Sequence, residues 1–153
     1  MGILRFMHGD GSAWPGLGAG VANGTKMIRD GRDVLFISSG IMTMRALEAA
    51  QALQQDQVDV AVLHVPTLKP LDTETILREA ARPGRLVVVA ENHSTIGGLG
   101  EAVATALMRA GIHPAFRQIA LPDAFLDAGA LPTLHDRYGI STTAVVASVK
   151  SWL

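Results

Sequence analysis

Three short, largely apolar runs constrain the fold of this chain more than any other feature, because none of them alternates regularly with polar residues. Each run has the length of a strand, and turn-forming residues such as Gly40, Pro66 and Gly84 separate the runs. A strand that is apolar on both faces must be covered on both sides, which favours a mostly parallel sheet between two layers of helices. The three runs span residues 34–37, 58–65 and 86–90, and a fourth strand is expected at 115–119.

Segments with a helical period separate these strands. Met42, Ala46, Ala49 and Leu53 recur at spacings of four, three and four residues, which places them on one face of a helix. Further helices are expected at 72–81, 97–110 and 142–153, with shorter helical pieces at 123–127 and 131–138. The alternation of strands and helices predicts an α/β fold, in the form of a single three-layer α/β/α sandwich.

Residues 1–30 differ from the rest of the chain because they are rich in glycine and show little periodicity. Such a segment is typical of a linker or an extended arm rather than of a packed core. We therefore expect residues 1–30 to form a leader, an interdomain linker or a tag. Residues 31–153 are expected to form the folded domain.

The composition excludes several classes of partner. The net charge is −1 and no long basic run occurs, whereas nucleic-acid binding needs clustered Lys and Arg. The absence of cysteine rules out disulfides, thiolate metal sites and a cysteine nucleophile, and it fits a cytoplasmic location. No apolar stretch approaches the roughly 20 residues that a membrane-spanning helix needs. We expect a cytoplasmic protein without nucleic-acid or membrane partners.

The segment 91–100 follows the third expected strand and is the strongest candidate for a functional loop. Its glycines open a helix whose N–H groups can hold a phosphate or another anion. Gly98 and Gly100 match the first two glycines of the dinucleotide fingerprint G-x-G-x-x-G, but Val103 stands at the third position. The alternative is that the glycines let the helix start lie close against a neighbouring element. The candidate interface or anion loop consists of Glu91, His93, Ser94, Gly97, Gly98 and Gly100.

The polar residues of this loop allow two interpretations. Glu91, His93 and Ser94 could form a catalytic cluster, since His is the natural proton shuttle near neutral pH. The chain has no G-x-S-x-G elbow, and such side chains more often satisfy turn and cap hydrogen bonds or contact a partner. Histidines at metal-ligand spacing and a P-loop are also missing. We therefore assign no catalytic, cofactor-binding or metal-binding residue to this chain.

Residues 91–100, Glu-Asn-His-Ser-Thr-Ile-Gly-Gly-Leu-Gly, resemble the Glu-(Asn/Glu)-His-Ser-x-Ile-Gly-Gly-Leu-Gly signature of transketolase C-terminal domains. Other family-like stretches occur in order along the chain, so that the resemblance covers residues 24–153. Several ordered motifs are more specific than any single one. The additional stretches lie at 31–34, 39–40, 67–72, 121–125 and 138–140.

The resemblance implies a five-stranded mixed sheet with one antiparallel edge strand. It also implies a part in a thiamine-diphosphate-dependent enzyme of the pentose phosphate pathway that moves a two-carbon ketol unit between sugar phosphates. In this family other domains bind thiamine diphosphate and magnesium, so the chain itself is expected to hold no cofactor and to be inactive alone. Gly9-Asp10-Gly11 resembles the start of the family's metal and diphosphate motif, but the closing asparagines are missing.

The resemblance further implies that the chain is a fragment or one subunit of a split enzyme, with a role in assembly. Its partners are then the remaining transketolase domains or an N-terminal subunit, with contacts across a homodimer. Two alternatives stay open. One is a regulatory module that binds a phosphate or a nucleotide, and the other is the β-subunit type of domain found in 2-oxo-acid dehydrogenases.

Overall fold

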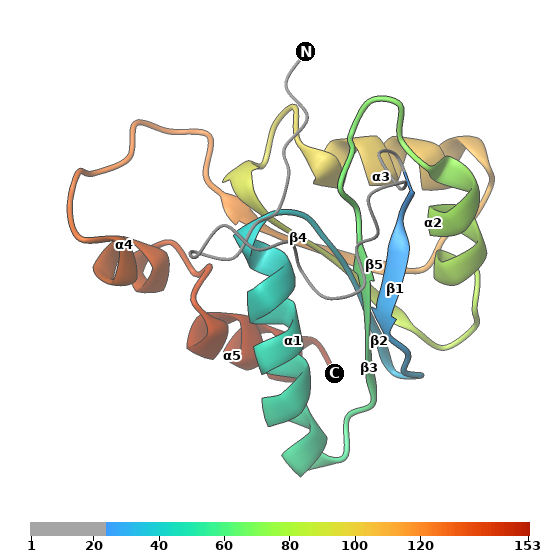
Figure 1. Cartoon of the computed structure of the whole chain (residues 1–153), viewed down its shortest axis with the longest axis horizontal. Helices are drawn as coiled ribbons and strands as arrows, with labels where there is room; N and C mark the ends of the chain where they lie inside the picture. The colour runs from blue at the N-terminus through green and yellow to red at the C-terminus, as the bar shows by residue number, and fades with distance from the viewer. Residues whose placement is uncertain (1–23) are drawn as a thin grey trace.

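The structure, a computed structural model, describes residues 24–153, which form a five-stranded sheet with helices on both faces (Figure 1). The strands lie in the order β1-β3-β2-β4-β5, with β1 antiparallel to β3 and the other described pairs parallel. The mixed sheet and the three-layer α/β/α sandwich expected from the sequence are thus confirmed. The strands are β1 Lys26–Arg29, β2 Val34–Ser38, β3 Val60–His64, β4 Leu86–Ser94 and β5 Ala115–Leu121.

Two hydrophobic cores lie on opposite faces of the sheet. Successive residues of a strand point to opposite faces, so Phe36 joins one core while Leu35 and Ile37 join the other, and all three are fully buried. Helices α1 and α5 cover the Phe36 face, and α2 and α3 cover the opposite face. This double cover explains why the inner strands β2 and β3 and the first part of β4 lack polar alternation.

The helices differ in how firmly they join these cores. Each of the other α-helices contributes buried residues, whereas α4 contributes none and stands apart at one end of the molecule (Figure 1). No helix within residues 24–153 is both long enough and apolar enough to cross a membrane. The helices are α1 Ile41–Leu53, the 3₁₀ turn η1 Gln54–Asp56, α2 Thr73–Ala80, α3 Leu99–Arg109, α4 Leu131–Arg137 and α5 Thr142–Trp152.

The sheet topology brings the loops after the parallel strands to one edge. The chain leaves β2 for α1 on one face and leaves β4 for α3 on the other, so these two loops diverge. In open α/β sheets, ligand sites lie in the crevice at this carboxyl edge, where the chain direction switches. The loop after β4 therefore starts where folds of this kind carry functional residues.

Two segments differ from the expectation based on sequence. Residues 123–127 form bends and irregular chain instead of the predicted helical piece. Phe125 is fully exposed there, so no burial of an apolar face supports a helix. Strand β1 lies inside the predicted leader, and its partly exposed edge position gave no apolar run to detect. The Gly9-Asp10-Gly11 stretch and the rest of residues 1–23 lie outside the described part of the chain.

Candidate functional site

The carboxyl end of β4 carries a buried carboxylate. Glu91 follows the apolar part of the strand, and only 1% of its surface is exposed. Its Oε2 accepts a hydrogen bond from the backbone N–H of Leu99 at 2.7 Å, and its Oε1 accepts one from Gly100 at 2.7 Å. Because Leu99 and Gly100 open α3, Glu91 caps this helix from the preceding strand.

The surroundings of Glu91 explain why a carboxylate is tolerated inside the protein. Burying an isolated charge is very unfavourable, but the start of a helix carries partial positive charge and unpaired N–H groups. Gln118 of β5 adds a third donor, with its Nε2 3.2 Å from Glu91 Oε1. The same Nε2 lies 3.4 Å from the carbonyl oxygen of Thr95 and so ties the turn to the sheet. The anion at the start of α3 is therefore a side chain of the protein itself.

Two glycines leave the space that this arrangement needs. A Cβ atom added at Gly98 would lie 2.2 Å from Glu91 Oε2. A Cβ atom added at Gly100 would lie 2.3 Å from Gln118 Nε2. Both distances are far below van der Waals contact, so any side chain at either position must displace a hydrogen-bonded group. The glycines that partly match a dinucleotide fingerprint thus serve close packing of α3 on the sheet.

His93 and Ser94 lie where the chain leaves the sheet, outside this buried contact. His93 is exposed, and its Nδ1 lies 3.3 Å from the backbone oxygen of Ser94. The Ser94 hydroxyl donates to Asp123 Oδ1 at 3.3 Å, in the loop that follows β5. The same oxygen accepts from the N–H of Ile96 at 3.2 Å. These contacts shape the turn and join it to the neighbouring loop.

The geometry does not assemble Glu91, His93 and Ser94 into one catalytic cluster. Glu91 is sealed beneath α3 with both oxygens bonded to N–H groups, so it has no access to a substrate. A Ser–His pair would need the hydroxyl and a ring nitrogen in contact, whereas the contact of each runs to another group. The loop is a structural cap with an exposed turn.

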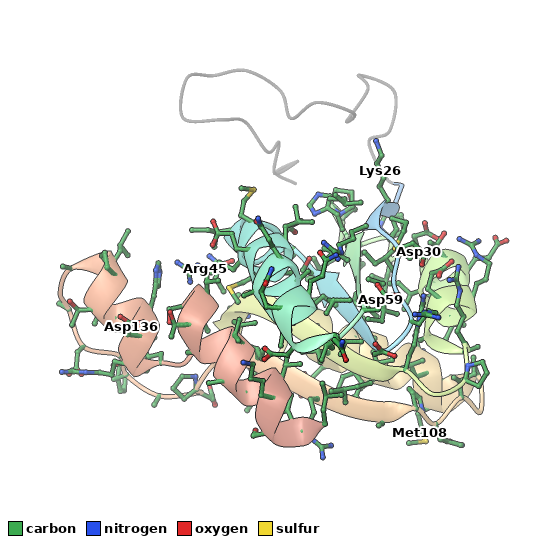
Figure 2. All side chains as sticks on the ribbon, turned by 90° about the horizontal axis from the view of Figure 1, so that it is seen from below. Lys26, Asp30, Arg45, Asp59, Met108 and Asp136 are labelled. Atoms are coloured by element: carbon green, nitrogen blue, oxygen red, sulfur yellow. The ribbon has the colours of Figure 1, made fainter. Side chains whose placement is uncertain are left out.

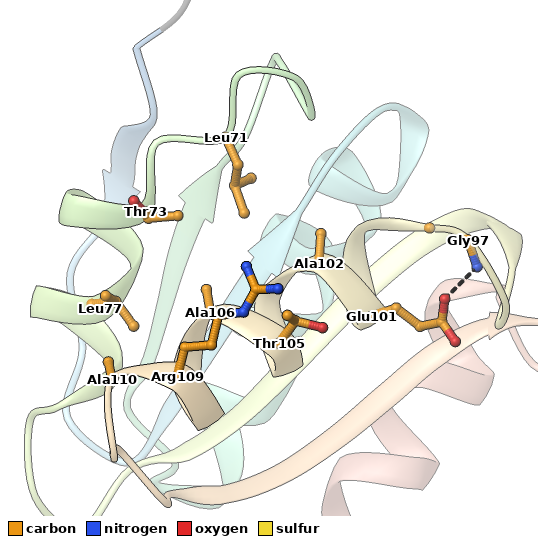
Figure 3. Close-up of a pocket in the computed structure, with 11 residues that line it drawn as sticks. Leu71, Thr73, Leu77, Gly97, Glu101, Ala102, Thr105, Ala106, Arg109 and Ala110 are labelled. Atoms are coloured by element: carbon orange, nitrogen blue, oxygen red, sulfur yellow. Dashed lines mark hydrogen bonds between the residues drawn. The ribbon is translucent and has the colours of Figure 1, made fainter.

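Gly97 connects this turn to a groove between α2 and α3. Its φ of 77° lies in the left-handed region that favours glycine, and its N–H donates to Glu101 Oε2 at 2.7 Å (Figure 3). The groove has a volume of about 670 Å³. Arg109 extends into it beside Thr105, and no ion pair of Arg109 occurs within residues 24–153 (Figure 3). The other walls are mainly small or apolar side chains: Leu71, Leu77, Ala102, Ala106 and Ala110.

A second polar cluster is buried at the carboxyl edge. The Ser38 hydroxyl donates to Thr43 Oγ1 at 3.1 Å, and Thr43 Oγ1 lies 2.9 Å from His64 Nδ1. All three residues are buried, and this burial lowers the pKa of His64. Neither this cluster nor Gln118 was predicted from the sequence. The residues come from separate strands and helices, and no spacing along the chain connects them.

The comparison with protein families identifies this architecture. The model of the transketolase C-terminal domain matches residues 23–145. The chain belongs to the transketolase family. A transketolase family protein of Sinorhizobium fredii is 71% identical over 129 residues, which make up 84% of this chain and 37% of that protein. A 1-deoxy-D-xylulose-5-phosphate synthase of Heliobacterium modesticaldum is 36% identical over 120 residues, or 78% of this chain and 18% of that enzyme.

A solved structure supports the same assignment. A split-gene transketolase, described as an inactive β4 tetramer, matches with a TM-score of 0.74 and 36% identity. The match covers 84% of this chain and 40% of that chain. This transketolase domain therefore spans less than half the length of each of these relatives.

The described residues of this transketolase domain show no cluster of metal-binding side chains. Magnesium is held by oxygen ligands such as carboxylates, phosphates and waters. No group of three His, Cys, Asp or Glu side chains within residues 24–153 is placed to hold a metal ion. No step of cofactor chemistry is therefore assigned to these residues.

Proposed function

We propose that this chain is the assembly domain of a thiamine-diphosphate-dependent enzyme of the transketolase type and has no turnover alone. The complete enzyme would move a two-carbon ketol unit between sugar phosphates, in the cytoplasm and within the pentose phosphate pathway. Thiamine diphosphate and magnesium would be held by the remaining transketolase domains or by an N-terminal subunit. The domain would add packing and contacts across a homodimer.

The main support for this proposal is that Glu91 acts inside the domain, where it caps α3. The most family-like segment of the chain places its one buried charge under α3, where three donors already satisfy it. The part of this segment that faces solvent is the turn with His93 and Ile96. A segment that is rigid within and exposed at its tip is suited to contact another protein surface.

The same observation weighs against the alternative of a phosphate- or nucleotide-binding module. A phosphate at the start of α3 would compete with the Glu91 carboxylate for the N–H groups of Leu99 and Gly100. It would also meet the repulsion of that carboxylate at short range. The groove beside Arg109 keeps an anion site open elsewhere on the domain. Titration of the chain with inorganic phosphate and ATP by calorimetry tests this alternative, and no heat at millimolar ligand would retire it.

Ketol transfer tests the main proposal. The isolated chain is assayed with thiamine diphosphate, Mg²⁺, a ketose phosphate donor and an aldose phosphate acceptor, and we expect no turnover. The chain is then co-expressed with the portion of the Sinorhizobium fredii relative that lies outside the match to this chain. The copurified assembly is expected to transfer the ketol unit. Turnover by the chain alone would contradict the assembly role.

A further inference from the structure

Exposed large apolar side chains gather at the carboxyl edge of the sheet. They lie in the loops that follow the four parallel strands, or in the first turn of α1, so the topology brings them to one edge. Met108, on α3, is a comparably exposed residue away from this edge. Clustered exposed apolar surface marks a site of interaction. We call the following residues the apolar rim: Ile41, Met44, Leu68, Ile96, Phe125 and Leu126.

Phe125 is the most exposed member of the apolar rim, with its whole side chain in solvent. Its loop is nevertheless tied down at several points. The N–H of Asp127 donates to the Tyr138 hydroxyl at 2.9 Å, and that hydroxyl donates to Asp127 Oδ2 at 3.2 Å. Asp123 accepts from Ser94, and Arg137 pairs with Asp127. Hydrogen bonds thus fix both sides of the short segment that carries this exposed aromatic ring, and such ordering before binding suits an anchor residue at an interface.

The shape and extent of the apolar rim indicate a protein partner. Its side chains come from three separate loops and the first turn of α1, so together they form a broad edge and not a closed cavity for a small ligand. The two carboxylates beside Phe125 already have partners within the domain, which lowers the cost of covering them. The occupant is therefore a largely apolar protein surface.

The relatives indicate which protein surface this is. The chain corresponds to 37% of the Sinorhizobium fredii protein and to 40% of the split-gene transketolase chain. A larger part of each of these proteins is therefore available to pack against this domain. We propose that the apolar rim docks on the cofactor-binding part of the enzyme, with Phe125 as the anchor; this inference rests on the proposed function.

A competition experiment with two matched variants tests the anchor. The complementary portion of the Sinorhizobium fredii relative is copurified with labelled wild-type chain, and unlabelled chains are added to displace the label. Phe125→Ser removes the rim anchor, and Met108→Ser removes an exposed apolar side chain at the far end of the molecule from α4, as the positions of Met108 and Asp136 show (Figure 2). Both variants should keep the wild-type unfolding midpoint because neither side chain is packed inside the domain.

We expect Phe125→Ser to compete at least tenfold less well than wild type, and Met108→Ser to compete within twofold. Hydroxyl-radical footprinting of the assembly adds an independent readout, in which Met44 should gain protection while Met108 stays reactive. Equal competition by the two variants, with Met44 unprotected, would overturn the rim as docking surface while leaving ketol transfer by the assembly unaffected. Failure of the wild-type chain to copurify would overturn the proposed function together with the docking surface.

Discussion

At the scale of single residues, Glu91 shows how a buried charge can serve a fold. Its carboxylate replaces the side-chain cap that α3 lacks, since no side chain at Gly98 can accept from the first N–H groups. The contact works only while position 98 carries no Cβ, because a Cβ there would collide with the carboxylate. Gly98 of the family-like signature is thus required for α3 to pack closely against β4.

Substitutions at the two glycines should differ in effect. Gly98→Ala forces a methyl group against the fixed Glu91 carboxylate, and we expect a loss of about 2–3 kcal/mol of unfolding free energy, as for other overpacked sites. Gly100→Ala meets the end of the Gln118 side chain, which can swing aside, and it gains helix propensity of about 1 kcal/mol. Urea unfolding measures both, and a Gly100→Ala variant less stable than Gly98→Ala would contradict this account.

At the scale of elements, the sequence predicted the buried strands and helices but not the contacts between elements that lie far apart in the chain. The apolar runs and the period of Met42, Ala46 and Ala49 gave the parallel strands and α1, because burial leaves a local pattern. The position of strand β1 was not predicted, and the helical piece predicted at 123–127 was wrong, because neither segment buries a complete apolar face. In the candidate site Glu91 was identified but its donors were not, since Gln118 lies on another strand and pairs with it only in three dimensions.

A charged cluster joins elements at the opposite edge of the sheet. Arg85, just before β4, has a buried guanidinium that pairs with Asp30 at 3.1 Å and lies 3.5 Å from Glu79 on α2. It also donates to the backbone oxygen of Gly31, in the turn between β1 and β2. One side chain thereby connects β4 to a helix and to the turn between β1 and β2.

Removal of this side chain should therefore be costly. We expect Arg85→Met to lower the unfolding free energy by about 3–4 kcal/mol, because it leaves the buried Glu79 with less compensation. The matched variant Arg32→Met breaks an ion pair of an arginine that is 88% exposed, and it should cost less than about 1 kcal/mol. Chemical denaturation compares them, and equal losses would show that Arg85 acts only as a surface charge.

At the scale of the whole molecule, the protonation of two histidines makes the free energy of unfolding depend on pH. Burial lowers the pKa of His64 at the carboxyl edge. Burial and the nearby Arg45 guanidinium lower the pKa of His135, which holds α4 against α1. Asp136 acts in the opposite direction on His135, but the net shift is downward. Both histidines therefore resist protonation in the folded chain.

Stability should consequently fall as the pH decreases from about 6.5, the ordinary histidine pKa. The unfolded chain binds the protons first, so the unfolding free energy decreases until the pH reaches the lowered folded values, below which this contribution levels off. Unfolding in urea between pH 7.5 and pH 5 measures the slope. His135→Gln should flatten it, because this variant removes one of the two histidines with a lowered pKa. An unchanged slope in His135→Gln would contradict the role of its contact with Arg45.

The cap that Glu91 supplies also has an evolutionary consequence. Because Glu91 on β4 caps α3, the exposed turn between β4 and α3 is not needed to start the helix. Selection can then act on His93 and Ile96 without disturbing how the domain folds. We therefore expect substitutions at His93 and Ile96 to leave the unfolding free energy of the domain nearly unchanged.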